Sequence, residues 1–144
     1  MTAPTQTEAL ELLILGDASL APDASLFAKL SANVTITGIR SNALTLLRKQ
    51  GRYARAQRPA LILLDLDGYG EQGWALLREI KGDPQLRRIP VIVLGASNSG
   101  QERARAYDLH ANSYLPRPED EAMLGALLEQ IEDFWLSKVR LPAG

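Results

Sequence analysis

Three aspartates follow apolar segments of this sequence, and they are the residues best placed to carry out chemistry. Asp17 follows one apolar run after a single glycine, Asp65 closes another, and Asp67 lies two residues further on. Mg²⁺ prefers oxygen ligands, and an ionised aspartate attacks phosphorus as a nucleophile. Two neighbouring carboxylates also repel each other unless a cation lies between them. The expected chemistry is therefore transfer of a phosphoryl group to Asp65, with Mg²⁺ and the cationic side chain of Arg117 stabilising the charge.

An aspartate at the end of a strand has a second common role, which is to cap the next helix or to begin a turn. For Asp17 this structural interpretation stands beside the chemical one. Asp67 precedes a glycine, which favours a turn over a side-chain metal ligand. Asp65 closes a fully apolar run, so the structural interpretation is weakest there.

The elements that must position these residues alternate along the chain. Strands are predicted where the residues are apolar or β-branched, at 10–15, 34–39, 60–65, 90–94 and 112–115. Helices are predicted at 22–30, 41–50, 74–81, 99–108 and 120–136. Alternating βα units form a doubly wound parallel sheet, and right-handed crossovers favour the flavodoxin-like α/β fold with strand order 2-1-3-4-5. The functional site of such a sheet lies outside the carboxyl ends of its strands.

The composition excludes several other classes of protein. A chain of 144 residues corresponds to one domain, expected at 9–136 between a flexible terminus at 1–8 and a C-terminal arm at 137–144. The lack of cysteine excludes a disulfide scaffold, and a single histidine, His110, excludes a multi-histidine metal site. A net charge of −1 argues against nucleic-acid binding, and no apolar run reaches the roughly 20 residues of a membrane helix. A soluble, cytoplasmic protein is expected, since the N-terminus also lacks the layout of a signal peptide.

Four segments of the sequence resemble the receiver domain of response regulators. They are Pro59–Asp67, Leu77–Leu86, Ile89–Leu94 and Asn112–Pro118. Two further segments, Gly51–Tyr53 and Ile131–Leu136, make the chain similar to the single-domain response regulators that partner phytochrome-type histidine kinases. The resemblance implies a signalling module that accepts phosphate from a histidine kinase, with a bacteriophytochrome as the kinase. It also implies that the protein is not an enzyme, beyond assisting its own phosphorylation and dephosphorylation.

The resemblance gives each candidate residue a role. Asp65 matches the phosphoacceptor, Asp17 matches an acid that binds Mg²⁺, and Asp67 matches the residue whose backbone carbonyl completes the metal site. Tyr114 matches the aromatic residue that acts as a switch, and Arg117 stands where the family has a lysine that faces the phosphate.

Five positions at or near this site depart from the family's pattern. The residues present are Gly16 for an acid, Gly95 for the switch serine or threonine, Arg117 for the lysine, Tyr69 for a turn proline and Gln72 for an acid. Losing one acid weakens the Mg²⁺ site, and a planar guanidinium is not equivalent to a compact ammonium. The hydroxyl missing at Gly95 removes a hydrogen bond of about 1.5–3 kcal/mol, where a full two-state shift needs about 5.5 kcal/mol. Without this hydroxyl, a packing role for Tyr114 is favoured over a role as a switch.

Two alternatives to a phosphoacceptor stay open. The departures favour a degenerate receiver that acts through protein contacts without phosphorylation, whereas Asp17 and Asp65 favour a working acceptor. A flavin- or nucleotide-binding enzyme on the same fold is the weaker alternative. Its phosphate cradle needs glycines and hydroxyls, whereas the loop at 16–22 has one glycine and an acid.

Two of the predicted helices carry further signals. Ser99 and Glu102 fit a capping box, in which the serine accepts from a backbone N–H and the glutamate reaches back. In the last helix five apolar residues recur at helical spacing and are expected to face the sheet: Met123, Leu124, Leu127, Leu128 and Ile131. Phe134, Trp135 and Leu136 exceed what the domain needs to cover itself, so 134–142 is interpreted as a homodimerisation arm.

Overall fold

The computed structural model describes residues 11–16, 33–37, 41–51, 54–55, 58–66, 71–95 and 100–134. The helix expected at 22–30 and the C-terminal arm lie outside these ranges. Four of the candidate site residues also lie outside them, namely Asp17, Asp67, Trp135 and Leu136.

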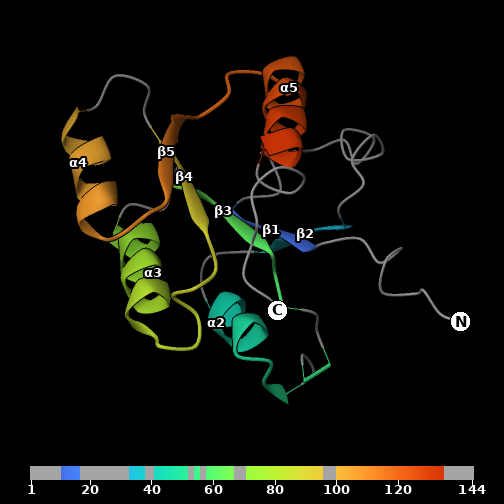
Figure 1. Cartoon of the computed structure of the whole chain (residues 1–144), viewed down its shortest axis with the longest axis vertical. Helices are drawn as coiled ribbons and strands as arrows, with labels where there is room; N and C mark the ends of the chain where they lie inside the picture. The colour runs from blue at the N-terminus through green and yellow to red at the C-terminus, as the bar shows by residue number, and fades with distance from the viewer. Residues whose placement is uncertain are drawn as a thin grey trace, which may run out of the picture.

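Five parallel strands form one sheet in the order β2-β1-β3-β4-β5, which can be followed in Figure 1. Their bounds are Glu11–Leu15 (β1), Asn33–Thr37 (β2), Leu61–Asp65 (β3), Val91–Gly95 (β4) and Ser113–Pro116 (β5). The order and the parallel pairing confirm the predicted flavodoxin-like α/β fold. Each strand begins or ends one or two residues from its predicted bound, because hydrogen bonds to the neighbouring strand decide where pairing stops.

The two strands nearest the site, β3 and β4, are buried at all five of their positions. Parallel strands that are covered on both faces have no side that faces solvent. Their sequences are therefore continuous apolar runs rather than alternating apolar and polar residues. β2 lies at the edge of the sheet and differs accordingly, with Val34 half-buried and Thr35 exposed. The β-branched, alternating character of β2 is thus a consequence of its edge position.

Four described helices cover the sheet: α2 (Ser41–Leu47), α3 (Glu71–Gly82), α4 (Gly100–Asp108) and α5 (Glu121–Ile131). Figure 1 shows α5 on one side of the sheet and α2, α3 and α4 on the other. Successive strand residues therefore enter different cores. Leu13 and Ile62 pack with the side chains of α2 and α3, whereas Leu12 and Leu63 pack with those of α5.

The last helix, α5, faces the sheet through a narrower stripe than expected. Asp120 caps its start by accepting a hydrogen bond from the Met123 N–H at 2.8 Å. The buried stripe consists of Leu124, Leu128 and Ile131. Leu127 is half-buried, and Met123 is 50% exposed, so the prediction that Met123 faces the sheet was wrong. One residue is a rotation of about 100° on a helix, which turns Met123 away from the stripe that begins at Leu124.

Two polar contacts fix α3 to its neighbours. At its start, Glu71 accepts hydrogen bonds from both terminal nitrogens of Arg105 on α4, at 2.9 Å and 2.6 Å. The Arg105 guanidinium also lies 4.5 Å from the centroid of the Trp74 ring. At its end, Lys81 Nζ donates to the carbonyls of residues 87 and 89 and to Asn112 Oδ1, at 3.0 Å, 2.8 Å and 2.9 Å. Burial lowers the pKa of Lys81 to about 8.

Candidate functional site

Asp65 is the last residue of β3 and lies at the carboxyl edge of the sheet. In the strand register it is paired with Leu94 of β4, which is paired in turn with Leu115 of β5. Asp65 is 0% exposed, and it is the one charged or polar residue among the described residues that is buried to this degree. A carboxylate can be buried in this way only when a cation or hydrogen-bond donors compensate for the lost water.

Arg117 supplies that compensation from the residue after β5. Its Nε donates a hydrogen bond to Asp65 Oδ1 at 3.0 Å, and the two charges form an ion pair. The Arg117 backbone N–H also donates to the carbonyl of Gly95 at 2.8 Å, which ties the start of this loop to the end of β4. The Arg117 side chain is 27% exposed, so its guanidinium lies between the buried carboxylate and solvent. The structure thus places Arg117 beside Asp65, at the flank of the site.

Gly16 lies immediately after β1 and close to the same carboxylate. Its N–H donates to the carbonyl of Thr37 at 3.0 Å. A Cβ added to Gly16 would lie 2.9 Å from Asp65 Cβ and 3.4 Å from Asp65 Oδ2. Since real Cβ atoms do not approach a neighbour this closely, an acid at position 16 would require Asp65 to shift. The glycine that stands in place of the acid therefore also permits the end of β1 to lie this close to Asp65.

Gly95 closes β4, and two side chains fill the space that a larger residue there would need. A Cβ added to Gly95 would lie 2.5 Å from the Tyr114 hydroxyl and 2.8 Å from Tyr114 Cε2, and it would also clash with the carboxylate of Glu102. Tyr114 is buried, and its hydroxyl donates to Glu102 Oε1 at 2.5 Å. Burial, together with the hydrogen bond and negative charge of Glu102, raises the pKa of Tyr114 to about 12, against the opposing effect of Arg103.

Glu102 is a site residue that the sequence did not indicate. The capping-box prediction paired it with Ser99, which lies outside the described part of the chain. The structure instead shows its carboxylate accepting from Tyr114, a residue of β5. No local pattern joins residues 12 positions apart on a helix and a strand. The one available signal is the presence of a glycine at the end of β4 together with a tyrosine in the neighbouring strand β5.

The metal site is described only in part. Asp65 offers a carboxylate of the kind that Mg²⁺ binds, whereas Asp17 and Asp67 lie outside the described ranges. Within those ranges, no three or more histidine, aspartate or glutamate side chains are grouped so that they could hold a metal ion. Of the expected dimer residues, only Phe134 is described, and it is 54% exposed.

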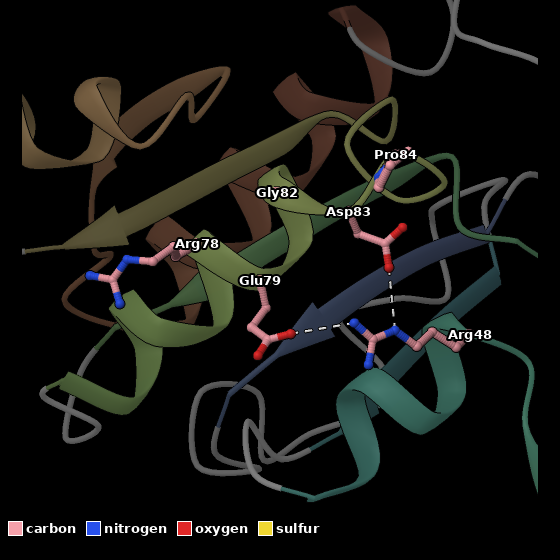
Figure 2. Close-up of a pocket in the computed structure, with 6 residues that line it drawn as sticks. All are labelled: Arg48, Arg78, Glu79, Gly82, Asp83 and Pro84. Atoms are coloured by element: carbon pink, nitrogen blue, oxygen red, sulfur yellow. Dashed lines mark hydrogen bonds and ion pairs between the residues drawn. The ribbon is translucent and has the colours of Figure 1, made fainter.

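A second candidate site is the groove between α2 and the C-terminal half of α3, shown in Figure 2. Arg48 reaches across it and pairs with Glu79 and Asp83, at 3.3 Å in both cases. Arg78, Gly82 and Pro84 complete its lining. Among the described residues that line the groove there is no histidine, serine or threonine that could act as a nucleophile or base, and the two acids are paired with Arg48. Its contacts are those that hold α2 to α3.

The chain matches the family described as the response regulator receiver domain over residues 24–129. The match covers more than half of the chain and includes β2 to β5, Asp65 and Arg117. The chain therefore belongs to the receiver-domain family of response regulators, the signalling modules of two-component systems. Phosphorylation of an aspartate is typical of this family. No described helix is both long enough and apolar enough to cross a membrane.

Within this family the chain is similar to response regulators of phytochromes. It is 43% identical over 101 residues to the response regulator Rcp1 of Synechocystis sp., which is 70% of this chain and 69% of Rcp1. The solved structure of the phosphorylated cyanobacterial phytochrome response regulator RcpA has a TM-score of 0.80 at 35% identity, covering 94% of this chain and 100% of RcpA. The bacteriophytochrome response regulator RtBRR has a TM-score of 0.68 at 27% identity, covering 95% of this chain and 86% of RtBRR.

Proposed function

We propose that Asp65 is the phosphoacceptor of this receiver domain and takes a phosphoryl group from a histidine kinase. The observation that carries the proposal is the buried carboxylate at the end of β3, held by the Arg117 guanidinium at 3.0 Å. In the transfer, a carboxylate oxygen of Asp65 bonds to phosphorus while the phosphorus–nitrogen bond to the kinase histidine breaks. An acyl phosphate forms and the imidazole leaves. Arg117 then binds a phosphoryl group that carries more negative charge than the carboxylate did.

Mg²⁺ is the cofactor that this proposal implies, with Asp65, Asp17 and the backbone carbonyl of Asp67 as its ligands. When bound, the ion neutralises charge on the transferring phosphoryl group. Two observations support the assignment: Asp65 is an oxygen donor of the required kind, and a Mn²⁺-bound form of Rcp1 has been solved. Because Gly16 replaces one acid, we expect weaker Mg²⁺ binding than at a full acidic pair.

The same proposal assigns roles to Gly95 and Tyr114. Gly95 has no hydroxyl to donate to a phosphoryl oxygen, so phosphorylation of Asp65 changes the end of β4 less than in a receiver with serine or threonine there. Tyr114 acts mainly as a packing residue between β5 and α4, in accord with its burial. Any catalysis is limited to assisting the formation and hydrolysis of the acyl phosphate.

The kinase partner we propose is a bacteriophytochrome in the cytoplasm. The proposal rests on the similarity to RcpA and RtBRR, which are response regulators of a phytochrome and a bacteriophytochrome. A homodimer through Phe134, Trp135 and Leu136 is supported by the exposure of the Phe134 ring. The net charge of −1 favours protein partners over nucleic acid. Light scattering coupled to size-exclusion chromatography tests the dimer, because Phe134→Asp should shift the protein toward the monomer.

A second candidate function is a degenerate receiver that binds its partner without phosphorylation. Three features favour it. Gly16 removes a metal-binding acid, Gly95 removes the switch hydroxyl, and Arg117 already pairs with Asp65 in the unphosphorylated protein. Under this function Asp65 would be a structural charge rather than an acceptor.

Intact-protein mass spectrometry separates the two functions. The full chain is incubated with Mg²⁺ and a small phosphodonor, beside the Asp65→Asn variant and beside a sample in EDTA. A phosphoryl adduct that requires both Mg²⁺ and Asp65 supports the acceptor. Absence of an adduct, while an ordinary receiver is labelled in parallel, calls for a second arm with a phosphorylated bacteriophytochrome kinase. Failure in both arms overturns the acceptor role and leaves the phosphorylation-independent function.

A further inference from the structure

The side chain of Tyr114 lies between the end of β4 and the start of α4. It fills the space that a side chain at position 95 would need. The Tyr114 hydroxyl and ring edge, together with the Glu102 carboxylate, lie where they would clash with a Cβ at position 95, and Gly95 has none. Any residue with a side chain at this position would have to displace one of the two. The glycine therefore creates the room in which Tyr114 and Glu102 meet.

Tyr114 is held from α4 along its whole length. Its hydroxyl donates to Glu102 Oε1 at 2.5 Å, and its backbone N–H donates to the Tyr107 hydroxyl at 3.3 Å. The Arg103 guanidinium lies 5.7 Å from the centroid of its ring. Glu102, Arg103 and Tyr107 all belong to α4, so Tyr114 of β5 contacts three residues of that helix. Only 4% of Tyr114 is exposed.

The hydroxyl–carboxylate contact is the strongest of these attachments. A hydrogen bond to an ionised acceptor is shorter than a bond between neutral groups and roughly twice as strong. Rotation of Tyr114 outward would break this bond, leave a void beside Gly95 and strip a hydrogen bond from a partly buried carboxylate. The inward position is thus stabilised by contacts that involve neither Asp65 nor a phosphoryl group.

We propose that Glu102 is a latch that holds Tyr114 inward in the unphosphorylated protein, so that the α4–β5 surface is set before any phosphoryl transfer. Gly95 is the residue that permits the latch to close. The proposal goes beyond the phosphoacceptor function, because it concerns the resting protein and does not depend on whether Asp65 is modified. A partner that binds the α4–β5 surface would then find it in one conformation throughout.

The exposure of the Tyr114 ring tests the latch directly. The full chain is labelled with ¹³C-tyrosine, and the relaxation caused by a soluble paramagnetic agent is measured for each tyrosine ring by NMR, without a phosphodonor. Tyr107, which is 48% exposed, gives the reference for an accessible ring. In the wild type, the Tyr114 ring should be relaxed several-fold less than that of Tyr107. Equal relaxation of the two rings would overturn the proposal.

Variants separate the carboxylate from the space that Gly95 provides. Glu102→Ala removes the hydrogen-bond acceptor of Tyr114. Gly95→Ser places a side chain where the Tyr114 hydroxyl now lies. Each variant should raise the relaxation of the Tyr114 ring several-fold. Glu102→Gln keeps the shape and should give a smaller rise. Glu129→Gln, which alters an exposed acid of α5, is the matched control and should change nothing. Circular dichroism checks that each variant is folded, and a Tyr114 ring that stays protected in both E102A and G95S overturns the latch.

A last arm adds the phosphodonor to the wild type and follows the same ring signals beside the intact mass. If an adduct forms and Tyr114 keeps its protection and chemical shift, the latch is supported. If the ring signals move as the adduct forms, the claim that the surface is already set is overturned. Where no adduct forms, the measurements on the resting protein still decide the latch, so its failure and that of the phosphoacceptor are distinguishable.

Discussion

Replacing Arg117 with methionine removes the ion pair of Asp65 and leaves the carboxylate in its buried place. Methionine keeps the unbranched stem of arginine, so the change tests the charge and the hydrogen bond from Nε at 3.0 Å. The side chain of Asp65 is 0% exposed, whereas that of Arg117 is 27% exposed. Removal of the Arg117 charge should therefore destabilise the protein more than removal of the Asp65 charge.

The expected size of the effect follows from that asymmetry. A buried charge that loses its partner lowers the free energy of unfolding by about 3–5 kcal/mol. Because Arg117 is partly exposed, water takes some of its place, and we expect the lower end, about 3 kcal/mol. Asp65→Asn removes the buried charge and leaves an arginine that reaches solvent, so its effect should lie within about 1 kcal/mol of zero. In the D65N background, R117M should cost at least about 2 kcal/mol less than in the wild type.

Urea unfolding followed by circular dichroism, near neutral pH and with EDTA present, measures these differences. With an m-value of about 1–3 kcal/mol/M, the midpoint of R117M should fall by about 1–3 M. Arg117→Lys keeps the charge but loses the planar fork, and as the matched control it should lose about 1 kcal/mol. A loss below about 0.5 kcal/mol for R117M, or equal losses in both backgrounds, would refute the ion pair as the support of Asp65.

Three further perturbations test other contacts of the fold. Gly16→Ala places a Cβ 2.9 Å from Asp65 Cβ and should lower the free energy of unfolding by about 1–3 kcal/mol. Gly82→Ala is the control and should not lower it, because no atom lies within 4 Å of the added Cβ. Equal urea midpoints for the two variants would contradict this. Burial lowers the pKa of Lys81 from 10.5 to about 8, so the unfolded chain binds more protons between these values and the free energy of unfolding should rise with pH there. Lys81→Met should flatten that rise between pH 8 and 10, and an unchanged slope would show that Lys81 does not cause it. Arg105→Ala breaks an exposed ion pair with α3, so the midpoint of thermal unfolding should change little. A large fall of that midpoint would mean that the contact of Arg105 with the Trp74 ring matters more than its charge.

The sheet and the place of Asp65 could be predicted from local patterns. Apolar runs that alternate with segments of helical periodicity predict βα units, and alternating βα units form a parallel sheet that is covered on both faces. An aspartate that ends the third strand then has to lie at the carboxyl edge, next to the residues that follow β4 and β5. This is why Asp65, Gly95 and Arg117 could be assigned to one region without coordinates.

The contacts within that region could not be predicted in the same way. Tyr114 and Glu102 are 12 positions apart, and their hydrogen bond depends on the angle of α4 against β5 and on two rotamers. Helical spacing also gave the wrong side for Met123, because an apolar stripe five residues wide contains more residues than the sheet can cover. Periodicity indicates a face of a helix but not its limits.

The fold, the strand order and the residue types at the site could be obtained from the amino-acid pattern alone, including the loss of an acid at Gly16 and of a hydroxyl at Gly95. What occupies the space of the missing groups depends on the packing of the folded chain. It brings β1 so close to Asp65 that position 16 has no room for a side chain, and it fills the space beside Gly95 with Tyr114 and Glu102. This difference arises because the order of apolar and polar residues indicates which residues are buried and in which element. Close packing between elements depends on distances that exist only once the sheet and its helices have come together.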